Sequence, residues 1–162
     1  MLRMILVLLL ALGAAIACSA RPGAAAGQRV LFVGNSLTYV GNLPAVYAAL
    51  ATANGQPTRS DMIVRGGATL SQRVADGSVQ AALASGGYSV LVLQERGGDL
   101  ACSFGPDSCV AARRALGELA TLARVHGVDV VLLGTYQTHP GASRKIVEVE
   151  AAAAAEAGIP YV

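Results

Sequence analysis

The sequence predicts a three-layer α/β/α domain built on a parallel β-sheet. Short apolar runs, which suit strands buried on both faces, alternate along the chain with longer segments of helical spacing. This strand–helix alternation favours parallel strands joined by right-handed helical crossovers. The chain is 54% hydrophobic and 14% charged, so it can bury a substantial core.

Apolar runs bounded by glycine and other turn residues predict the strands. The first run, residues 29–33, ends at Gly34 and is uninterrupted. The later strands are expected at residues 61–64, 88–93, 128–133 and 159–162. Since the last of these begins so close to residue 162, we expect the final strand and the helix after it to be incomplete.

Helical spacing between these runs predicts the covering helices. Asn42 is expected to cap the first helix, Gly77 weakens the second, and Gly158 ends the last. The predicted helices are residues 43–53, 69–84, 110–125 and 142–157. The segment 95–108 is then a long loop between a strand and a helix, and loops of that length are often functional.

Residues 1–17 predict a secretory signal peptide. The apolar stretch 4–17 follows a basic residue and is shorter than the roughly 20 residues of a membrane span. The small residues before Cys18 suit cleavage and also resemble a bacterial lipoprotein signal, in which the cysteine is lipidated. Residues 18–28 then form a tether to a domain covering residues 29–162. We therefore expect an exported protein: periplasmic, extracellular, or an outer-membrane lipoprotein tethered through Cys18. An uncleaved signal anchor is the alternative.

Cys102 and Cys109 lie in the long loop, with Gly105, Pro106 and Asp107 between them. In an oxidising compartment they can close a small disulfide loop, and two free thiols are the alternative. No histidine stands at ligand spacing from this pair, so no metal site is expected.

Charge and aromatic content exclude a nucleic-acid partner. The net charge is +2, the arginines are scattered, and there is no tryptophan. Neither the Walker pattern nor the dinucleotide glycine spacing occurs, so no nucleotide cofactor is implied.

Ser36 is the candidate nucleophile. It follows the first strand in Gly34-Asn35-Ser36-Leu37, and parallel sheets bind ligands at the carboxyl ends of their strands. Backbone N–H groups of the following turn can point at a developing oxyanion. The same residues also suit an ordinary strand-to-helix turn.

Two motifs resemble those of the SGNH (GDSL-type) hydrolases. Gly34-Asn35-Ser36-Leu37 is similar to the family's Gly-Asp-Ser-Leu motif, and Arg65-Gly66-Gly67-Ala68 follows the second strand as the family's second motif does. The resemblance implies a flavodoxin-like sheet and ester hydrolysis through Ser36, without a cofactor. It implies an oxyanion hole that includes the Ser36 and Gly67 N–H groups, with Gly66 as the competitor for the second position. Small-molecule, carbohydrate acetyl or lipid esters are the substrates that it suggests.

The chain departs from the family pattern at two further motifs. Where the family has an oxyanion-hole asparagine after the third strand, this chain has Gln94, whose amide can supply an equivalent donor. The family's Asp-x-x-His motif, which supplies the general base, does not occur in the sequence. His126 is expected at the opposite end of the sheet, so His139 is the remaining candidate base. We therefore expect impaired activity in a truncated member of the family. A non-catalytic exported binding module with the same fold is the alternative.

Overall fold

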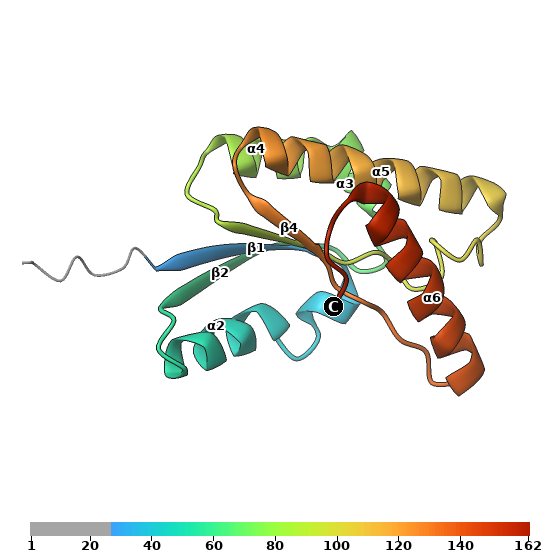
Figure 1. Ribbon diagram of the computed structural model, residues 1–162, viewed down its shortest axis with the longest axis horizontal. Helices are drawn as coiled ribbons and strands as arrows, with labels where there is room; N and C mark the ends of the chain where they lie inside the picture. The colour runs from blue at the N-terminus through green and yellow to red at the C-terminus, as the bar shows by residue number, and fades with distance from the viewer. Residues whose placement is uncertain (1–26) are drawn as a thin grey trace, which may run out of the picture.

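The computed structural model describes residues 27–162 (Figure 1). The predicted signal peptide, Cys18 and the tether up to residue 26 lie outside the described residues. Among residues 27–162, no helix is both long enough and apolar enough to cross a bilayer.

The centre of the molecule is a fully parallel sheet with strand order β2-β1-β3-β4. The strands are β1 (Gln28–Gly34), β2 (Thr58–Val64), β3 (Val90–Leu93) and β4 (Asp129–Leu132). The predicted parallel sheet is therefore confirmed, although β2 starts three residues earlier than expected and β3 two residues later.

The fifth strand is present only as its beginning. Tyr161 forms a single parallel bridge with Leu132 of β4. The Leu132 N–H donates to the Pro160 carbonyl at 2.9 Å, and the Val162 N–H donates to the Leu132 carbonyl at 3.0 Å. The segment after the last helix, where the sequence predicted a strand, thus joins the sheet beside β4.

Helices cover both faces of the sheet. They are α1 (Ser36–Tyr39), α2 (Leu43–Ala53), α3 (Leu70–Ala75), α4 (Ser78–Ala84), α5 (Pro106–Val125) and α6 (Pro140–Ala157). In Figure 1, α2 lies on one face, and α3, α4 and α5 lie on the other. Helix α6 packs against α5, where Arg113 Nη1 and Glu156 Oε2 form an ion pair at 2.6 Å.

The helices differ from the prediction at residues with a special backbone conformation. Asn42 does not cap α2 through its side chain, because it adopts a left-handed conformation with φ of 53°. The helix expected over residues 69–84 is broken at Gly77, which has φ of 67°. Helix α5 begins at Pro106, since proline is well suited to the first turn of a helix.

The alternating side chains of the strands form two unequal apolar layers. Leu31, Val33, Leu91 and Leu93 point into the main core and pack with α3, α4 and α5. On the other face, Val30, Phe32 and Val92 form a smaller cluster, with Val90, Val131 and Leu133 only partly buried around it. The Phe32 ring packs edge-on against Tyr47 of α2 at 5.7 Å.

Candidate active site

The candidate site begins where β1 ends. Asn35 follows the strand in an extended conformation, and its Oδ1 accepts a hydrogen bond from the Leu37 N–H at 3.1 Å. This cap turns the chain directly into α1, so Ser36 opens the helix at the carboxyl edge of the sheet. Ser36 is half-buried, and its hydroxyl has no hydrogen-bond partner within residues 27–162.

Glycine is required at position 34 by close packing. A Cβ built there would lie 2.7 Å from Gln94 Oε1 and 3.1 Å from Gln94 Cβ, and it would also meet Thr38 Oγ1. Both neighbours are buried and hydrogen-bonded to each other, so they have little room to move. The loop that carries Ser36 therefore rests directly on the loop that follows β3.

A second contact joins the Ser36 loop to the glycine pair after β2. Asn35 Nδ2 donates to the Ala68 carbonyl at 3.1 Å, and Asn35 is buried. Gly67, immediately before Ala68, has φ of 66°, a left-handed conformation that favours glycine. Ser36 and Gly67 thus come from adjacent, directly bonded loops. Within the described part of the chain, neither of their backbone N–H groups has a partner.

Gln94 has a supporting position beneath the Ser36 loop. Its Oε1 accepts from the Asn35 N–H at 3.2 Å and from Thr38 Oγ1 at 2.8 Å. Its Nε2 donates to the Glu95 carbonyl, and the residue is only 1% exposed. These contacts engage both ends of the Gln94 amide with the protein itself. The predicted oxyanion role of Gln94 stays a prediction.

Glu95 is a buried carboxylate between two loops of the site. Its Oε1 accepts from the Arg96 N–H at 2.8 Å, and both oxygens accept from the Leu70 N–H, at 3.1 and 3.2 Å. Burial raises the pKa of Glu95 to about 7, against the effect of these hydrogen bonds. Glu95 therefore holds the loop after β2, which contains the glycine pair, against the loop after β3.

The loop after β3 is itself braced by charge and by a disulfide. Arg96 Nε and Nη2 donate to the two Asp99 oxygens at 2.7 and 2.9 Å, and this hydrogen bonding raises the pKa of Arg96. The guanidinium also lies over the Phe104 ring, 3.9 Å from its centroid. Cys102 and Cys109 are joined by a disulfide across this loop.

Each of the two histidines lies at the end of a different helix. His126 caps the C-terminus of α5. His139 caps the N-terminus of α6, where its Nδ1 accepts from the Ala142 N–H at 3.4 Å. Within residues 27–162, neither imidazole is hydrogen-bonded to Ser36. The predicted role of His139 as a base therefore stays a prediction.

A buried carboxylate that sequence reasoning missed stands beside the end of β4. Glu150 of α6 accepts from the Thr135 N–H at 2.9 Å, from Thr135 Oγ1 at 2.5 Å and from the Tyr161 hydroxyl at 3.2 Å. Burial and the Glu150 charge raise the pKa of Tyr161 to about 12. The available signal was an acidic residue four positions after Ile146, which puts it on the buried stripe of an alanine-rich helix.

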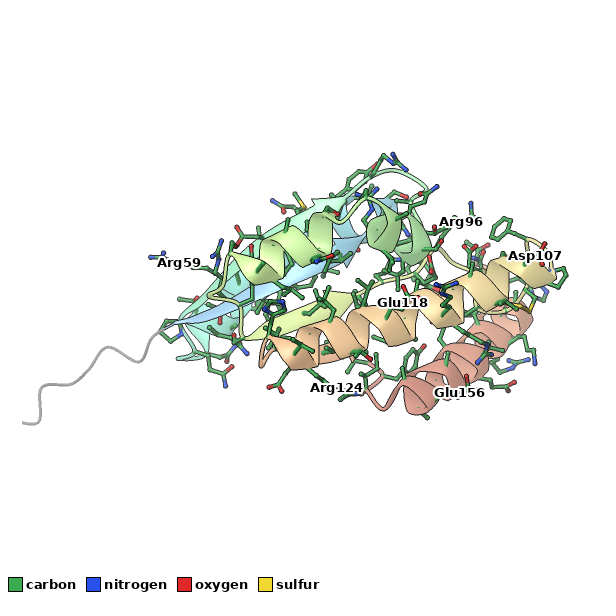
Figure 2. All side chains as sticks on the ribbon, turned by 90° about the horizontal axis from the view of Figure 1, so that it is seen from above. Arg59, Arg96, Asp107, Glu118, Arg124 and Glu156 are labelled. Carbon is green, nitrogen blue, oxygen red and sulfur yellow. A yellow bond between two sulfur atoms is a disulfide. The ribbon has the colours of Figure 1, made fainter. Side chains whose placement is uncertain are left out.

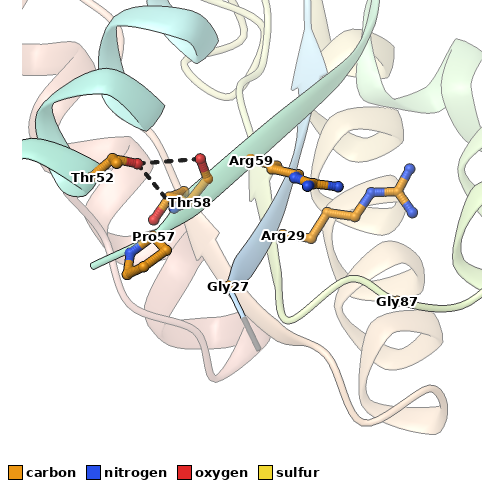
Figure 3. Close-up of a pocket in the computed structure, with 7 residues that line it drawn as sticks. All are labelled: Gly27, Arg29, Thr52, Pro57, Thr58, Arg59 and Gly87. Carbon is orange, nitrogen blue, oxygen red and sulfur yellow. Dashed lines mark hydrogen bonds between the residues drawn. The ribbon is translucent and has the colours of Figure 1, made fainter. Parts of the chain in front are cut away.

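A hollow at the amino edge of the sheet lies apart from the residues around Ser36. It measures about 550 Å³ and is lined by Arg29, Arg59 and residues near the start of β1 and β2 (Figure 3). Figure 2 shows the same separation: Arg59 lies toward the end where the chain enters β1, whereas Arg96 and Asp107 lie toward the opposite end. We place the candidate site by its hydrogen-bond geometry, because Ser36 does not line this hollow.

Comparison with known proteins supports the fold. No protein-family model and no curated protein sequence matches the chain. Among solved structures, a Slackia heliotrinireducens protein assigned as an SGNH hydrolase is 28% identical with a TM-score of 0.69; the match covers 83% of this chain and 78% of that one.

Two esterases of lower identity have the same architecture. Esterase EstA from Pseudoalteromonas, inhibited by monoethylphosphonate, is 12% identical with a TM-score of 0.63, over 83% of this chain and 76% of its own. A catalytic mutant of an acetylxylan esterase from Geobacillus stearothermophilus is 16% identical with a TM-score of 0.61, over 84% and 75%. With its four-stranded parallel sheet flanked by helices, this chain has an SGNH-hydrolase-like fold and resembles the GDSL-type serine ester hydrolases.

Proposed function

We propose that the chain is a serine ester hydrolase with Ser36 as its nucleophile. Ser36 Oγ attacks the ester carbonyl carbon and passes its proton to a base, and the carbonyl oxygen becomes an oxyanion. When this intermediate collapses, the bond to the alcohol breaks and the alcohol leaves with a proton. Water then attacks the acyl group on Ser36 and releases the acid.

The observation that carries this proposal is the geometry of the two adjacent loops. The Ser36 hydroxyl, which has no partner among the described residues 27–162, stands at the carboxyl edge, and the hydrogen bond from Asn35 to Ala68 ties its loop to the one that contains Gly67. The Ser36 and Gly67 N–H groups, which have no partner within residues 27–162, are the proposed backbone donors to the oxyanion.

Small-molecule esters, including carbohydrate acetyl esters, are the proposed substrates. The similarity to an acetylxylan esterase supports this class. Exposed side chains from the loops after β1, β3 and β4, namely Leu37, Phe104 and Tyr136, offer apolar surface for the rest of such a molecule.

We also propose that the protein is exported. The disulfide between Cys102 and Cys109 supports this, because such bonds persist in oxidising compartments.

Hydrolysis of p-nitrophenyl acetate tests the catalytic proposal. Because no imidazole is hydrogen-bonded to Ser36 within residues 27–162, the assay includes a titration with free imidazole as an external base. We expect the wild-type rate to rise more steeply with imidazole than the rate of Ser36→Ala, which reports only the direct reaction of imidazole with the ester.

Ser103→Ala is the matched control, since it removes an exposed hydroxyl from another loop of the site. It should behave like the wild type. Equal rates for the wild type and Ser36→Ala at every imidazole concentration would contradict the proposal.

A further inference from the structure

The oxyanion hole proposed above uses two backbone N–H groups and no side-chain donor. The family resemblance places one after β3, but Gln94 is buried there and both ends of its amide bond to the protein. The two backbone N–H groups of Ser36 and Gly67 therefore leave a third position open around a developing oxyanion.

Tyr39 lies beside that position. It stands three residues after Ser36 in the single turn of α1, so the two side chains lie on the same side of the helix. Thr38, between them, points the other way and is fully buried against Gln94. Tyr39 is 38% exposed, and its hydroxyl has no hydrogen-bond partner within residues 27–162.

The Tyr39 ring reaches from the Ser36 loop to the glycine pair. Its hydroxyl oxygen lies 3.2 Å from the point where a Cβ at Gly66 would stand. Among residues 27–162, and apart from the chain neighbours of Gly66, no other atom lies within 4 Å of that point, so the missing side chain makes room for the phenol. The phenol hydroxyl thus lies beside Gly66 of the glycine pair, on the side of α1 that carries Ser36, and within residues 27–162 it donates to no protein acceptor.

We propose that the Tyr39 hydroxyl is the side-chain donor of the oxyanion hole. The phenol O–H donates a hydrogen bond to the substrate carbonyl oxygen, and this bond strengthens as the oxygen gains negative charge. The proton stays on Tyr39 throughout, so no covalent bond of the tyrosine forms or breaks. The inference rests on the proposed function, because it assigns a role at the same site.

Tyr39→Phe tests the proposal, since it removes only the hydroxyl. With p-nitrophenyl acetate and imidazole, we expect the Ser36-dependent part of kcat to fall about 10-fold to 100-fold, with KM nearly unchanged. Tyr47→Phe is the control: Tyr47 is also 38% exposed, but it lies on α2 against Phe32. It should retain wild-type kcat.

Gly66→Ala provides an independent test of the same contact. The added methyl meets the Tyr39 hydroxyl at 3.2 Å and displaces it, so kcat should fall in this variant as well. If both changes act through one hydroxyl, the double variant should lose little more than Tyr39→Phe alone. Additive losses would overturn the link between Gly66 and Tyr39.

The two proposals fail in distinguishable ways. If Ser36→Ala leaves the imidazole-stimulated rate unchanged, the proposed function itself fails. If the rate depends on Ser36 but Tyr39→Phe matches the wild type, only the donor role of Tyr39 is overturned.

Discussion

The two edges of the sheet are built on different principles. At the carboxyl edge, buried polar side chains from separate loops bond to one another, as Asn35, Gln94 and Glu95 do. At the amino edge, Arg29 and Arg59 line an open hollow, and Arg29 pairs with Asp61 where both are about two-fifths exposed. A polar group is costly to bury, so the carboxyl edge retains its buried polar groups only because each is bonded in place.

This contrast shows why hollow volume is a poor guide to the site. The hollow at the amino edge is open, and its polar groups are solvated. The residues around Ser36 do not line that hollow, yet their loops are fixed relative to one another by hydrogen bonds. Catalysis needs donors held in position more than it needs volume. Substitutions at the carboxyl edge should therefore affect stability and activity more than substitutions at the amino edge.

The largest effect is expected for Gly34→Ala. The added methyl would crowd the buried side chains of Thr38 and Gln94, and the Ser36 loop would have to move. We expect the free energy of unfolding, measured with urea, to fall by about 3 kcal/mol or more, at the upper end of what overpacking costs. Gly117→Ala in α5 is the control: nothing lies near its added methyl, and it should stabilise the protein by about 0.5 to 1 kcal/mol. A Gly34→Ala protein as stable as the wild type would contradict the packing at this edge.

Glu95→Gln should remove a pH dependence of stability. The pKa of Glu95 is about 7 in the folded protein and 4.5 when exposed, so the folded state binds this proton more tightly. The stability contributed by this group is therefore greatest below pH 4.5 and is lost as the pH rises through 7, a fall on the order of 3 kcal/mol.

Urea unfolding of both proteins from pH 4 to pH 8 measures this difference. The glutamine keeps an oxygen for the Leu70 N–H, so Glu95→Gln should overtake the wild type in stability as the pH rises. Parallel pH profiles for the two proteins would show that Glu95 is not perturbed by burial.

Asn35→Ala should lower the stability by about 2 kcal/mol, because it removes the cap of α1 and leaves the buried Ala68 carbonyl without its donor. Asn35→Asp separates the two roles, since aspartate keeps the cap but cannot donate to Ala68. It should recover stability only in part, and Ser36-dependent hydrolysis should stay low. Full activity in Asn35→Asp would show that the bond between the two loops does not position Ser36.

The smallest effect is expected at the amino edge. Asp61→Asn weakens an exposed ion pair with Arg29, so the free energy of unfolding should change by less than about 1 kcal/mol. The change should shrink further in high salt. A loss as large as that for Asn35→Ala would contradict the difference between the two edges.

Much of this architecture follows from local sequence patterns. The alternation of apolar runs with segments of helical spacing predicted the parallel sheet, and the position of Ser36 after the first run predicted its place at the carboxyl edge. Extended structure at residues 159–162 was also predicted, and Tyr161 there forms a bridge with Leu132 of β4. These features depend on residues close together in the chain.

The rest depends on contacts between distant residues. The sequence around Gln94 does not show whether its amide is free at the surface or bonded inside the protein. Its partner Asn35 is 59 residues away in the chain. The same holds for Glu150, whose partners Thr135 and Tyr161 come from other segments. The left-handed backbone of Asn42 has a local cause instead, the short turn between α1 and α2, although its residue type suited a cap.

Covalent labelling with a fluorophosphonate tests the central claim most directly. Ser36 Oγ would bond to phosphorus as the phosphorus–fluorine bond breaks, with the proton passing to imidazole in the buffer and fluoride leaving. Mass spectrometry of the digested full chain should then find one label, on Ser36, which is absent when the protein is unfolded in urea before labelling. A folded protein that takes no label there, or that reacts equally at an exposed serine such as Ser103, would contradict the account.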